Sequence, residues 1–262
     1  MKLELRNVSC GYEKDKPILN NVNLELDSGQ VCCILGPNGV GKTTLFKTML
    51  NLLKPVSGKV YIDSENIGSW SAKRTSQVFA YVAQAHVPSY PYLVREMTMM
   101  GRMGQIGISA KPSKKDYEVV EQAMEDVGIR HLRDARYTEI SGGERQLLMI
   151  ARALAQEPKF LVMDEPTANL DYGNMVLVMK CINDLAGRDM GVIFTSHIPD
   201  QAFMVDSKVA LLLRNKPMIF GDAGDVMTER NLNEAYHTDI QVLEIIGEGG
   251  RPVRVVAPRF RK

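Results

Sequence analysis

The chain has 262 residues, of which 45% are hydrophobic and 24% are charged, and its formal net charge is +1. This length and composition predict one large globular domain or a domain with an insertion, and the balanced charge argues against a nucleic-acid-binding protein. No run approaches the roughly 20 apolar residues of a membrane span, and no basic-then-apolar leader opens the chain, so we expect neither a span nor export. Cys10, Cys32, Cys33 and Cys181 lack the spacing of a metal site and are expected to be reduced, cytosolic core thiols.

The beginning of the chain predicts a small antiparallel sheet. Residues 3–26 alternate enough in hydrophobicity for two strands around a turn at residues 13–16. Residues 59–63 read as a further strand after a turn at residues 55–58.

Between these strands lies a strong nucleotide-binding motif. The motif G-x-x-x-x-G-K-[ST] is matched by Gly36, Pro37, Asn38, Gly39, Val40, Gly41, Lys42 and Thr43. An apolar run at residues 30–35 predicts a buried strand before it, and residues 44–50 predict an amphipathic helix after it, with Leu52 on the apolar side. Glycines let backbone N–H groups point at phosphate oxygens, while Lys42 reaches the β- and γ-phosphates and Thr43 offers its hydroxyl to Mg²⁺.

The middle of the chain predicts a helical region. Residues 94–100 and 117–127 have helical periodicity, and the Gly-rich residues 101–111 are expected to form a flexible connection between them. A methionine cluster in this region is expected to belong mainly to the core, with an adaptable contact surface as the alternative. Its members are Met97, Met99, Met100 and Met103.

A second candidate phosphate site follows. Residues 141–146 read Ser-Gly-Gly-Glu-Arg-Gln and precede the apolar run 147–150. The start of a helix presents backbone N–H groups and the positive end of the helix dipole, so it suits phosphate. The alternative is a helix cap without a ligand.

Two polar strand ends complete the chemistry. Residues 160–163 predict a buried strand that ends in Asp164 and Glu165. In phosphoryl transfer such carboxylates hold Mg²⁺ and orient the attacking water, so we assign these roles to Asp164 and Glu165 respectively. A second apolar run, at residues 191–195, leads to His197.

The last third of the chain alternates short helices and strands. Residues 199–205 and 230–236 predict helices, and residues 209–213 predict a strand. Residues 247–262, Gly-rich and then basic, are expected to form a peripheral strand or tail.

These motifs, in this order, resemble the nucleotide-binding subunit of an ATP-binding cassette (ABC) transporter over nearly the whole chain. The resemblance implies an α/β P-loop NTPase cassette with a RecA-like mixed sheet core, an antiparallel β-subdomain and an inserted helical subdomain. We expect residues 1–246 to form this ATPase domain, with the core in 1–84 and 155–246. The helical subdomain then covers about 85–154, and 247–262 form a tail.

The resemblance also implies site residues, with ATP and Mg²⁺ as cofactors. The expected ATP contacts are Tyr12 on adenine, Gly36, Pro37, Asn38, Gly39, Val40, Gly41, Lys42, Thr43, Thr44, Ser141, Gly142, Gly143, Glu144 and Asp171. The expected catalytic residues are Glu165, His197 and Gln84, and the expected metal ligands are Thr43, Gln84 and Asp164. This chain departs from the family pattern at Ile140, Ala83, Asn169 and Ile198.

In this family the signature motif of one subunit covers the ATP held by the other, so the expected partner is a second copy in a head-to-tail dimer. The resemblance further implies two transmembrane permease subunits, an extracytoplasmic substrate-binding protein acting indirectly, no nucleic acid, and a peripheral location on the cytoplasmic side of the cell membrane.

The pattern around Val94-Arg95-Glu96 and Gly101-Arg102 resembles the importer branch for iron–siderophore, haem and cobalamin uptake. The expected function is therefore metal-chelate import. A molybdate or tungstate importer is the alternative, and a non-transport ABC ATPase of repair or translation is an alternative of another class.

Overall fold

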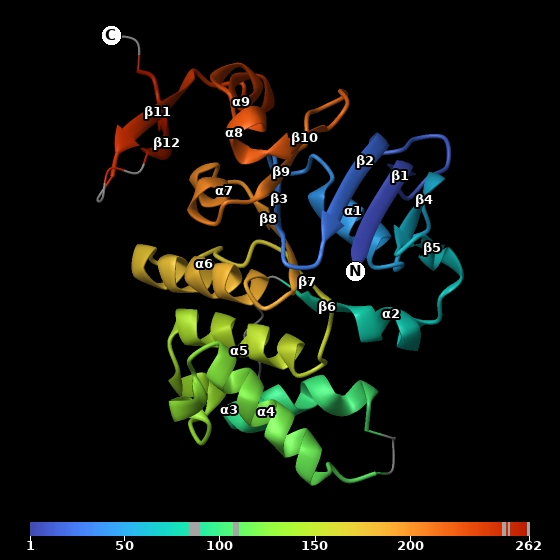
Figure 1. Ribbon diagram of the computed structural model, residues 1–262, viewed down its shortest axis with the longest axis vertical. Helices are drawn as coiled ribbons and strands as arrows, with labels where there is room; N and C mark the ends of the chain where they lie inside the picture. Colours follow the sequence, from blue (N-terminus) through green and yellow to red (C-terminus); the bar gives the residue numbers. More distant parts are fainter. Residues whose placement is uncertain (84–89, 107–109, 248–249, 251, 261–262) are drawn as a thin grey trace. The chain divides into compact units, whose positions relative to one another are not determined.

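The structure is a computed structural model that forms two compact units (Figure 1). The first unit comprises Met1–Trp70 and Ile193–Lys262, and the second comprises Ser71–Val192. The residues that the structure describes are 1–83, 90–106, 110–247, 250 and 252–260. Among these residues, no helix combines the length and the apolar character that crossing a membrane requires.

The first unit contains a four-stranded antiparallel sheet with the order β2-β1-β4-β5. Its strands are β1 (Lys2–Cys10), β2 (Leu19–Asp27), β4 (Ser57–Ile62) and β5 (Glu65–Asn66), the last followed by the 3-10 helix η1 (Ile67–Ser69). Buried and exposed residues alternate along much of β2, because one face of the sheet is covered and the other meets solvent. The expected pair of strands around a tight turn is thereby confirmed.

The first unit also contains a mixed parallel and antiparallel arrangement. Strand β3 (Val31–Leu35) is buried at every position and pairs in parallel with β9 (Lys208–Leu211), which pairs antiparallel with β10 (Ile219–Asp222). Burial on both faces explains why Cys32 and Cys33, which point in opposite directions, are both free core thiols.

Helix α1 (Lys42–Met49) follows β3, and it ends before the expected apolar position Leu52. Asn51 takes a left-handed φ of 56°, which turns the chain away from the helix and leaves Leu52 70% exposed. The placement of Leu52 on the buried side was therefore wrong.

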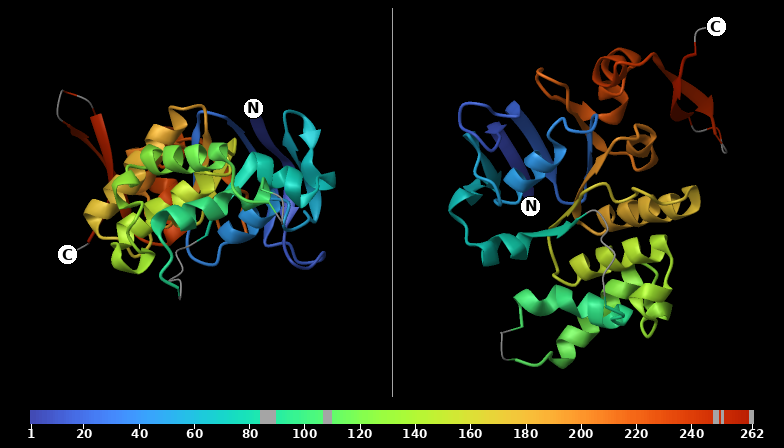
Figure 2. Two further views of the ribbon diagram at one scale, coloured as in Figure 1. Left: turned by 90° about the horizontal axis from the view of Figure 1, so that it is seen from below. Right: turned by 180° about the vertical axis from the view of Figure 1, so that it is seen from behind.

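The rest of the first unit confirms the expected alternation of short elements. In chain order these are the end of β8 (Gly191–Ser196), α7 (Asp200–Met204), β9, β10, α8 (Ala223–Val226), α9 (Glu229–Tyr236), β11 (Ile240–Ile246) and β12 (Pro252–Pro258). Strands β11 and β12 form a two-stranded antiparallel hairpin next to α9 (Figure 2), and β12 is the strand expected beyond residue 247.

The second unit is mainly helical. Its helices are α2 (Ala72–Val78), α3 (Val94–Met99), α4 (Lys114–Asp126), α5 (Gly142–Leu154) and α6 (Tyr172–Ala186), with the 3-10 helices η2 (Met100–Gly104), η3 (Arg130–Leu132) and η4 (Tyr137–Glu139). Helices α3, α4 and α5 pack against one another, and Figure 1 shows them in colours from blue-green to yellow-green. Two strands, β6 (Phe79–Val82) and β7 (Phe160–Met163), pair in parallel.

One expectation for the helical region needs correction. Within the expected flexible connection 101–111, Gly101 and Arg102 are buried in η2, while residues 107–109 lie outside the described part. The methionine cluster divides: Met97 is 6% exposed and belongs to the core, whereas Met103 is 70% exposed. Glycine at position 101 therefore serves close packing rather than flexibility.

Two helices of the second unit begin with capping boxes. At α5, the Ser141 hydroxyl accepts from the Glu144 N–H at 3.3 Å, and a Glu144 carboxylate oxygen accepts from the Ser141 N–H at 2.7 Å. Ser113 and Asp116 make the same reciprocal pair at α4. Each pair satisfies two backbone donors that the helix itself leaves unpaired. The backbone hydrogen bond from Ser141 lowers the pKa of Glu144.

This cap predicts a pH-dependent contribution to stability. A carboxylate with a depressed folded-state pKa stabilises the fold above its unfolded pKa, and the contribution is lost as the pH falls through the folded value. A glutamine can still accept this hydrogen bond but carries no charge, so we expect Glu144→Gln to lower the unfolding free energy by about 0.3–1 kcal/mol near pH 7. That deficit should shrink below the ordinary value of 4.5, as urea unfolding at several pH values would show.

Glu139→Gln is the matched control, because Glu139 is exposed and forms a surface ion pair with Arg136. We expect it to change stability little at any pH. A Glu144→Gln deficit that stays constant in acid would refute the role of the carboxylate.

Candidate nucleotide site

The loop between β3 and α1 is shaped by glycines at positions where a side chain does not fit. At Gly36, a Cβ atom would lie 2.9 Å from the Leu212 carbonyl oxygen. At Gly41, where φ is 116°, a Cβ atom would lie 2.9 Å from Cγ2 of Ile18. The loop therefore follows a path that only glycine allows at these two positions.

The start of α1 combines backbone donors with a buried cation. Gly41 is the N-cap residue and has no side chain to occupy the first N–H groups of the helix. Lys42 is 6% exposed, and its ammonium donates to the Gly36 carbonyl at 2.7 Å. The ammonium is thus held against the loop itself, and the first turn of the helix follows directly in the chain. This arrangement suits an anion with several oxygen atoms, such as a phosphate chain.

The other loop residues have distinct positions. Val40 is buried, and its N–H donates to the Pro37 carbonyl at 3.4 Å. The Asn38 carbonyl accepts from the Arg214 guanidinium at 3.4 Å. Thr43 is exposed in the first turn of α1, whereas Thr44 is buried.

Tyr12 presents an exposed ring that α1 anchors. The ring is 63% exposed, and the Lys47 ammonium lies 5.5 Å from its centroid and donates to its hydroxyl at 3.2 Å. This hydrogen bond from Lys47 lowers the pKa of Tyr12. A flat, exposed aromatic face beside the helix that follows the phosphate loop is suited to stacking on a base.

The end of β7 carries the two predicted carboxylates. The β6–β7 ladder extends past the strand, because the Asp164 N–H donates to the Val82 carbonyl at 2.9 Å. Tyr81 donates its hydroxyl to Oδ2 of Asp164 at 3.4 Å, and burial followed by the Asp164 charge raises the pKa of Tyr81 to about 12. Tyr81 therefore stays protonated as a donor at neutral pH.

Glu165 has an unusual backbone conformation. Its φ is 47°, in the left-handed region that a glutamate rarely adopts. The Glu165 carbonyl accepts from the Ala168 N–H at 3.0 Å, so a tight turn holds this conformation. Strained residues of this kind cluster at functional sites.

The N-terminus of α5 lies against the N-terminus of α6. Ser141 and Gly142 are exposed, while Gly143 is buried so closely against Asn174 that a Cβ atom there would lie 2.1 Å from Oδ1 of Asn174. Asp171 is the N-cap of α6 and accepts from both the backbone and the side-chain nitrogen of Asn174 at 2.8 and 2.7 Å. The two loops with the expected residues Ser141–Glu144 and Asp171 are thus brought together through Asn174.

His197 follows β8 in a turn set by Ser196. The Ser196 hydroxyl accepts from the Ile198 N–H at 2.9 Å and donates to Oε1 of Gln201 at 2.8 Å. His197 itself is exposed. Gln84, the remaining expected residue, lies outside the described residues.

Four contacts of the expected residues were not found from the sequence. Each contact joins an expected residue to a partner that is distant in the sequence. The pairs are Tyr12 with Lys47, Asp164 with Tyr81, Asn38 with Arg214, and Gly143 with Asn174. No motif marks these residues. Only the parallel pairing of residues 79–82 with 160–163 would have indicated Tyr81.

Two of the expected metal ligands, Thr43 in the first unit and Asp164 in the second, each carry an oxygen donor of the type that Mg²⁺ prefers. The described residues contain no group of three or more His, Cys, Asp or Glu side chains suited to a metal ion. Mg²⁺ is usually held by one or two protein oxygens together with substrate phosphates and water, and the Thr43 hydroxyl and the Asp164 carboxylate are oxygen donors of this type.

Comparison with known proteins identifies the family. The ABC transporter family model matches residues 19–168. The chain is 34% identical over 236 residues to the molybdate import ATP-binding protein MolC of Haemophilus influenzae, covering 90% of this chain and 88% of that protein. It is 31% identical over 236 residues to the hemin import ATP-binding protein HmuV of Hahella chejuensis, covering 87% and 90%.

A solved structure also matches nearly the whole chain. It is an inward-facing conformation of an ABC transporter assigned to the metal-chelate type, with a TM-score of 0.87, 30% sequence identity, and coverage of 99% of this chain and 98% of that one. The expected cassette fold is confirmed by this match. The chain therefore belongs to the ABC transporter family and is one of its ATP-binding ATPases.

Proposed function

We propose that this ATPase powers a membrane importer of a metal chelate of the iron–siderophore, haem or cobalamin type. The observation that carries the proposal is the presence of two helix starts suited to phosphate, the loop before α1 and the exposed Ser141–Gly142 at α5. The names of the import relatives and the structural match to a metal-chelate type transporter support the direction of transport.

The two phosphate sites are explained if each active site is built from two copies of the chain. One copy holds ATP with its phosphate loop, and the partner covers the γ-phosphate with Ser141, Gly142 and Gly143. If a two-fold axis relates the copies, so that the phosphate loop of each faces the helix start of the other, the pair closes as a dimer with two equal sites. Asp171, beside this helix start, would carry the contact between the copies.

Glu144 has a different role in this proposal. Its carboxylate already accepts from the Ser141 N–H, and a carboxylate would repel a phosphate. We therefore assign Glu144 to shaping the helix start on which the partner's ATP rests, and not to direct phosphate contact.

The chemistry of each site follows from the charges of the residues. Lys42 and the loop N–H groups neutralise the β- and γ-phosphates, and Tyr12 stacks on adenine. When bound, Mg²⁺ supplies further charge neutralisation, with Thr43, Asp164 and Gln84 as the residues that would hold it. Glu165 orients water for in-line attack, and His197 contacts the γ-phosphoryl group as charge develops on it.

The work of transport is done by partners in this proposal. ATP binding closes the dimer and hydrolysis releases it, which would drive two transmembrane permease subunits fed by an extracytoplasmic binding protein. The ATPase would then lie peripherally on the cytoplasmic side of the cell membrane. Exposed apolar residues of the second unit, Tyr90 at 66% and Met103 at 70%, are candidates for the permease contact.

Molybdate or tungstate import is the second candidate, because a relative named for molybdate import is 34% identical to this chain. The test uses vesicles that contain the ATPase with its permease. Stimulated ATPase activity and uptake of a labelled haem, siderophore or cobalamin would support chelate import. Uptake of molybdate alone would favour the second candidate, and an ATPase that no permease stimulates would contradict importer function.

The role of Glu165 predicts a separation of binding from turnover. Glu165→Gln keeps the shape of the side chain but cannot polarise water, so we expect unchanged ATP binding and a loss of hydrolysis of about a hundredfold or more. Glu139→Gln, an exposed change in the same unit, should keep the parent rate. Binding by filter assay and phosphate release would measure both, and hydrolysis at the parent rate in Glu165→Gln would exclude the proposed role.

The shared site predicts that two substitutions at Ser141, which introduce side chains of nearly the same shape, differ in their effect on ATPase activity. Asp and Asn are both good N-cap residues, so Ser141→Asp and Ser141→Asn should each keep the stability of α5. Only Asp places a negative charge where the partner's γ-phosphate is expected. We expect Ser141→Asp to lose ATPase activity while the single chain still binds ATP, and Ser141→Asn to retain most of both. Equal activities of the two variants would contradict phosphate contact at this helix.

A further inference from the structure

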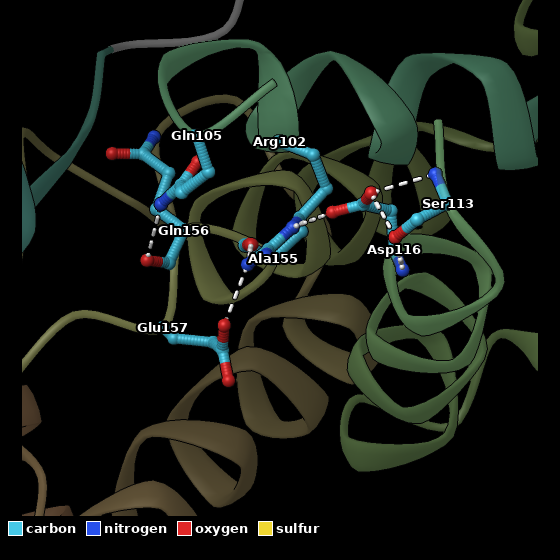
Figure 3. A network of polar contacts seen from close by, with 7 residues as sticks. All are labelled: Arg102, Gln105, Ser113, Asp116, Ala155, Gln156 and Glu157. Carbon is cyan, nitrogen blue, oxygen red and sulfur yellow. Dashed lines mark hydrogen bonds and ion pairs between the residues drawn. The ribbon is translucent and has the colours of Figure 1, made fainter. Parts of the chain in front are cut away.

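The Gly101-Arg102 pair, part of the pattern that resembles the importer branch, is buried in the second unit. Figure 3 shows the polar contacts of Arg102. The Arg102 side chain is 6% exposed and contacts three residues that belong to two segments, α4 and the end of α5. Its Nε donates to Oδ1 of Asp116 at 3.0 Å, and its Nη1 donates to the Ala155 carbonyl at 2.8 Å and to Oε2 of Glu157 at 2.7 Å. A buried guanidinium with this many directed partners has one orientation available to it.

These contacts lie at the C-terminal end of α5. Ala155 is the C-cap residue of this helix, so Arg102 places a positive charge on the negative end of the helix dipole and satisfies a terminal carbonyl. Gly101 packs on the same turn so closely that a Cβ atom would lie 2.0 Å from the Arg152 carbonyl oxygen. Gln105 adds a hydrogen bond to the Gln156 carbonyl at 3.0 Å.

The opposite face of Arg102 is fixed by α4. Oδ2 of Asp116 accepts from both the N–H and the hydroxyl of Ser113, at 2.8 and 2.6 Å. The Ser113 hydrogen bonds, and then the Arg102 guanidinium, hold the pKa of Asp116 below its usual range. Asp116 is therefore a rigid anion at the capped N-terminus of α4, and Arg102 joins it to the C-terminus of α5.

Strand β7 is held in a different way. It pairs with β6, and further backbone hydrogen bonds extend this pairing at both ends. The Lys159 N–H donates to the Val78 carbonyl and the Asp164 N–H donates to the Val82 carbonyl, each at 2.9 Å. The carboxylates at the end of β7 are thus positioned by backbone hydrogen bonds. Helix α5 has no such strand pairing. The contacts of Arg102 fix its C-terminal end, from which the chain continues to β7.

We infer that Arg102 is a positioning residue for the helix start at Ser141, and that it acts on the ATP held by the partner copy rather than on the ATP of its own chain. The inference rests on the proposed shared site. A rigid helix transmits a tilt at its last turn to its first turn, and small displacements of a group that contacts the reacting phosphate change rates strongly.

Single variants provide the first test. We expect Arg102→Gln to reduce the ATPase rate at saturating ATP by roughly ten- to a hundredfold without changing the affinity of the single chain for ATP. Arg102→Lys keeps the positive charge but loses the planar guanidinium and its several donors. Its ATPase rate should therefore lie between the rates of the parent protein and of Arg102→Gln. Arg130→Gln is the matched control, because Arg130 is 56% exposed and pairs with Glu121 and Glu125 at the surface of the same unit.

Thermal unfolding of each variant shows whether the chain has folded, and Arg102→Lys replaces Arg102→Gln if the latter has not. Full activity in a folded Arg102→Gln protein, or a loss of ATP affinity equal to the loss of rate, would overturn the inference.

The decisive test uses defined heterodimers, purified through two different affinity tags. An Arg102→Gln chain paired with a Lys42→Ala chain has one site with both an intact phosphate loop and an intact Arg102 opposite it. We expect this heterodimer to recover activity well above either homodimer. The heterodimer of Ser141→Asp with Lys42→Ala is the reference for the shared site itself.

The two heterodimers separate the two proposals. Recovery in both supports the inference. Recovery with Ser141→Asp but not with Arg102→Gln shows that Arg102 acts within its own chain, which overturns the inference and leaves the proposed function standing. Recovery in neither contradicts the shared site, and the inference fails with it.

Discussion

Unpaired backbone N–H groups at the start of a helix are the constraint on which this structure depends. Every α-helix leaves its first donors without an internal partner, and a protein must satisfy them with side chains, water or a ligand. The helices of this chain differ in how these first donors are satisfied. Helix α4 is closed by Ser113 and Asp116, whereas α1 begins at a glycine beside the buried Lys42. Helix α5 lies between these cases, because its cap satisfies two donors while Ser141 and Gly142 remain exposed.

A second constraint is that the carboxylates proposed to act in hydrolysis need rigid supports. Parallel strands buried on both faces provide them, since the ladder fixes the last residue of a strand before the chain turns away. Asp164 is held in this way by a hydrogen bond to Val82, and the turn that follows holds Glu165 in its left-handed conformation. Asn169, where the family usually has a small residue, also has a left-handed φ of 61°. Asparagine tolerates this region better than most residues, so the departure is compatible with the turn.

The sequence predicted what depends on local patterns. The alternation of β2, the buried runs of β3 and β7 and the glycine loop are properties of neighbouring residues, and they appear in the structure as expected. The failures concern contacts between distant residues. Because glycine is common in loops, the sequence predicts a flexible position at Gly101. Its neighbour in the structure is the Arg152 carbonyl, about fifty positions away, which no local sequence window contains. Tyr81 was missed for the same reason.

The two ends of α5 show how one helix combines local and distant information. Its N-terminus is encoded within four residues, from Ser141 to Glu144, and a motif can therefore identify it. Its C-terminus is defined by Arg102, which is distant in the sequence and is itself held by Asp116. A buried arginine contributes little net stability compared with apolar packing, because desolvation offsets its ion pairs. Its directed hydrogen bonds specify orientation instead, and orientation is what a helix needs if its first turn must meet a phosphate held by another copy of the chain.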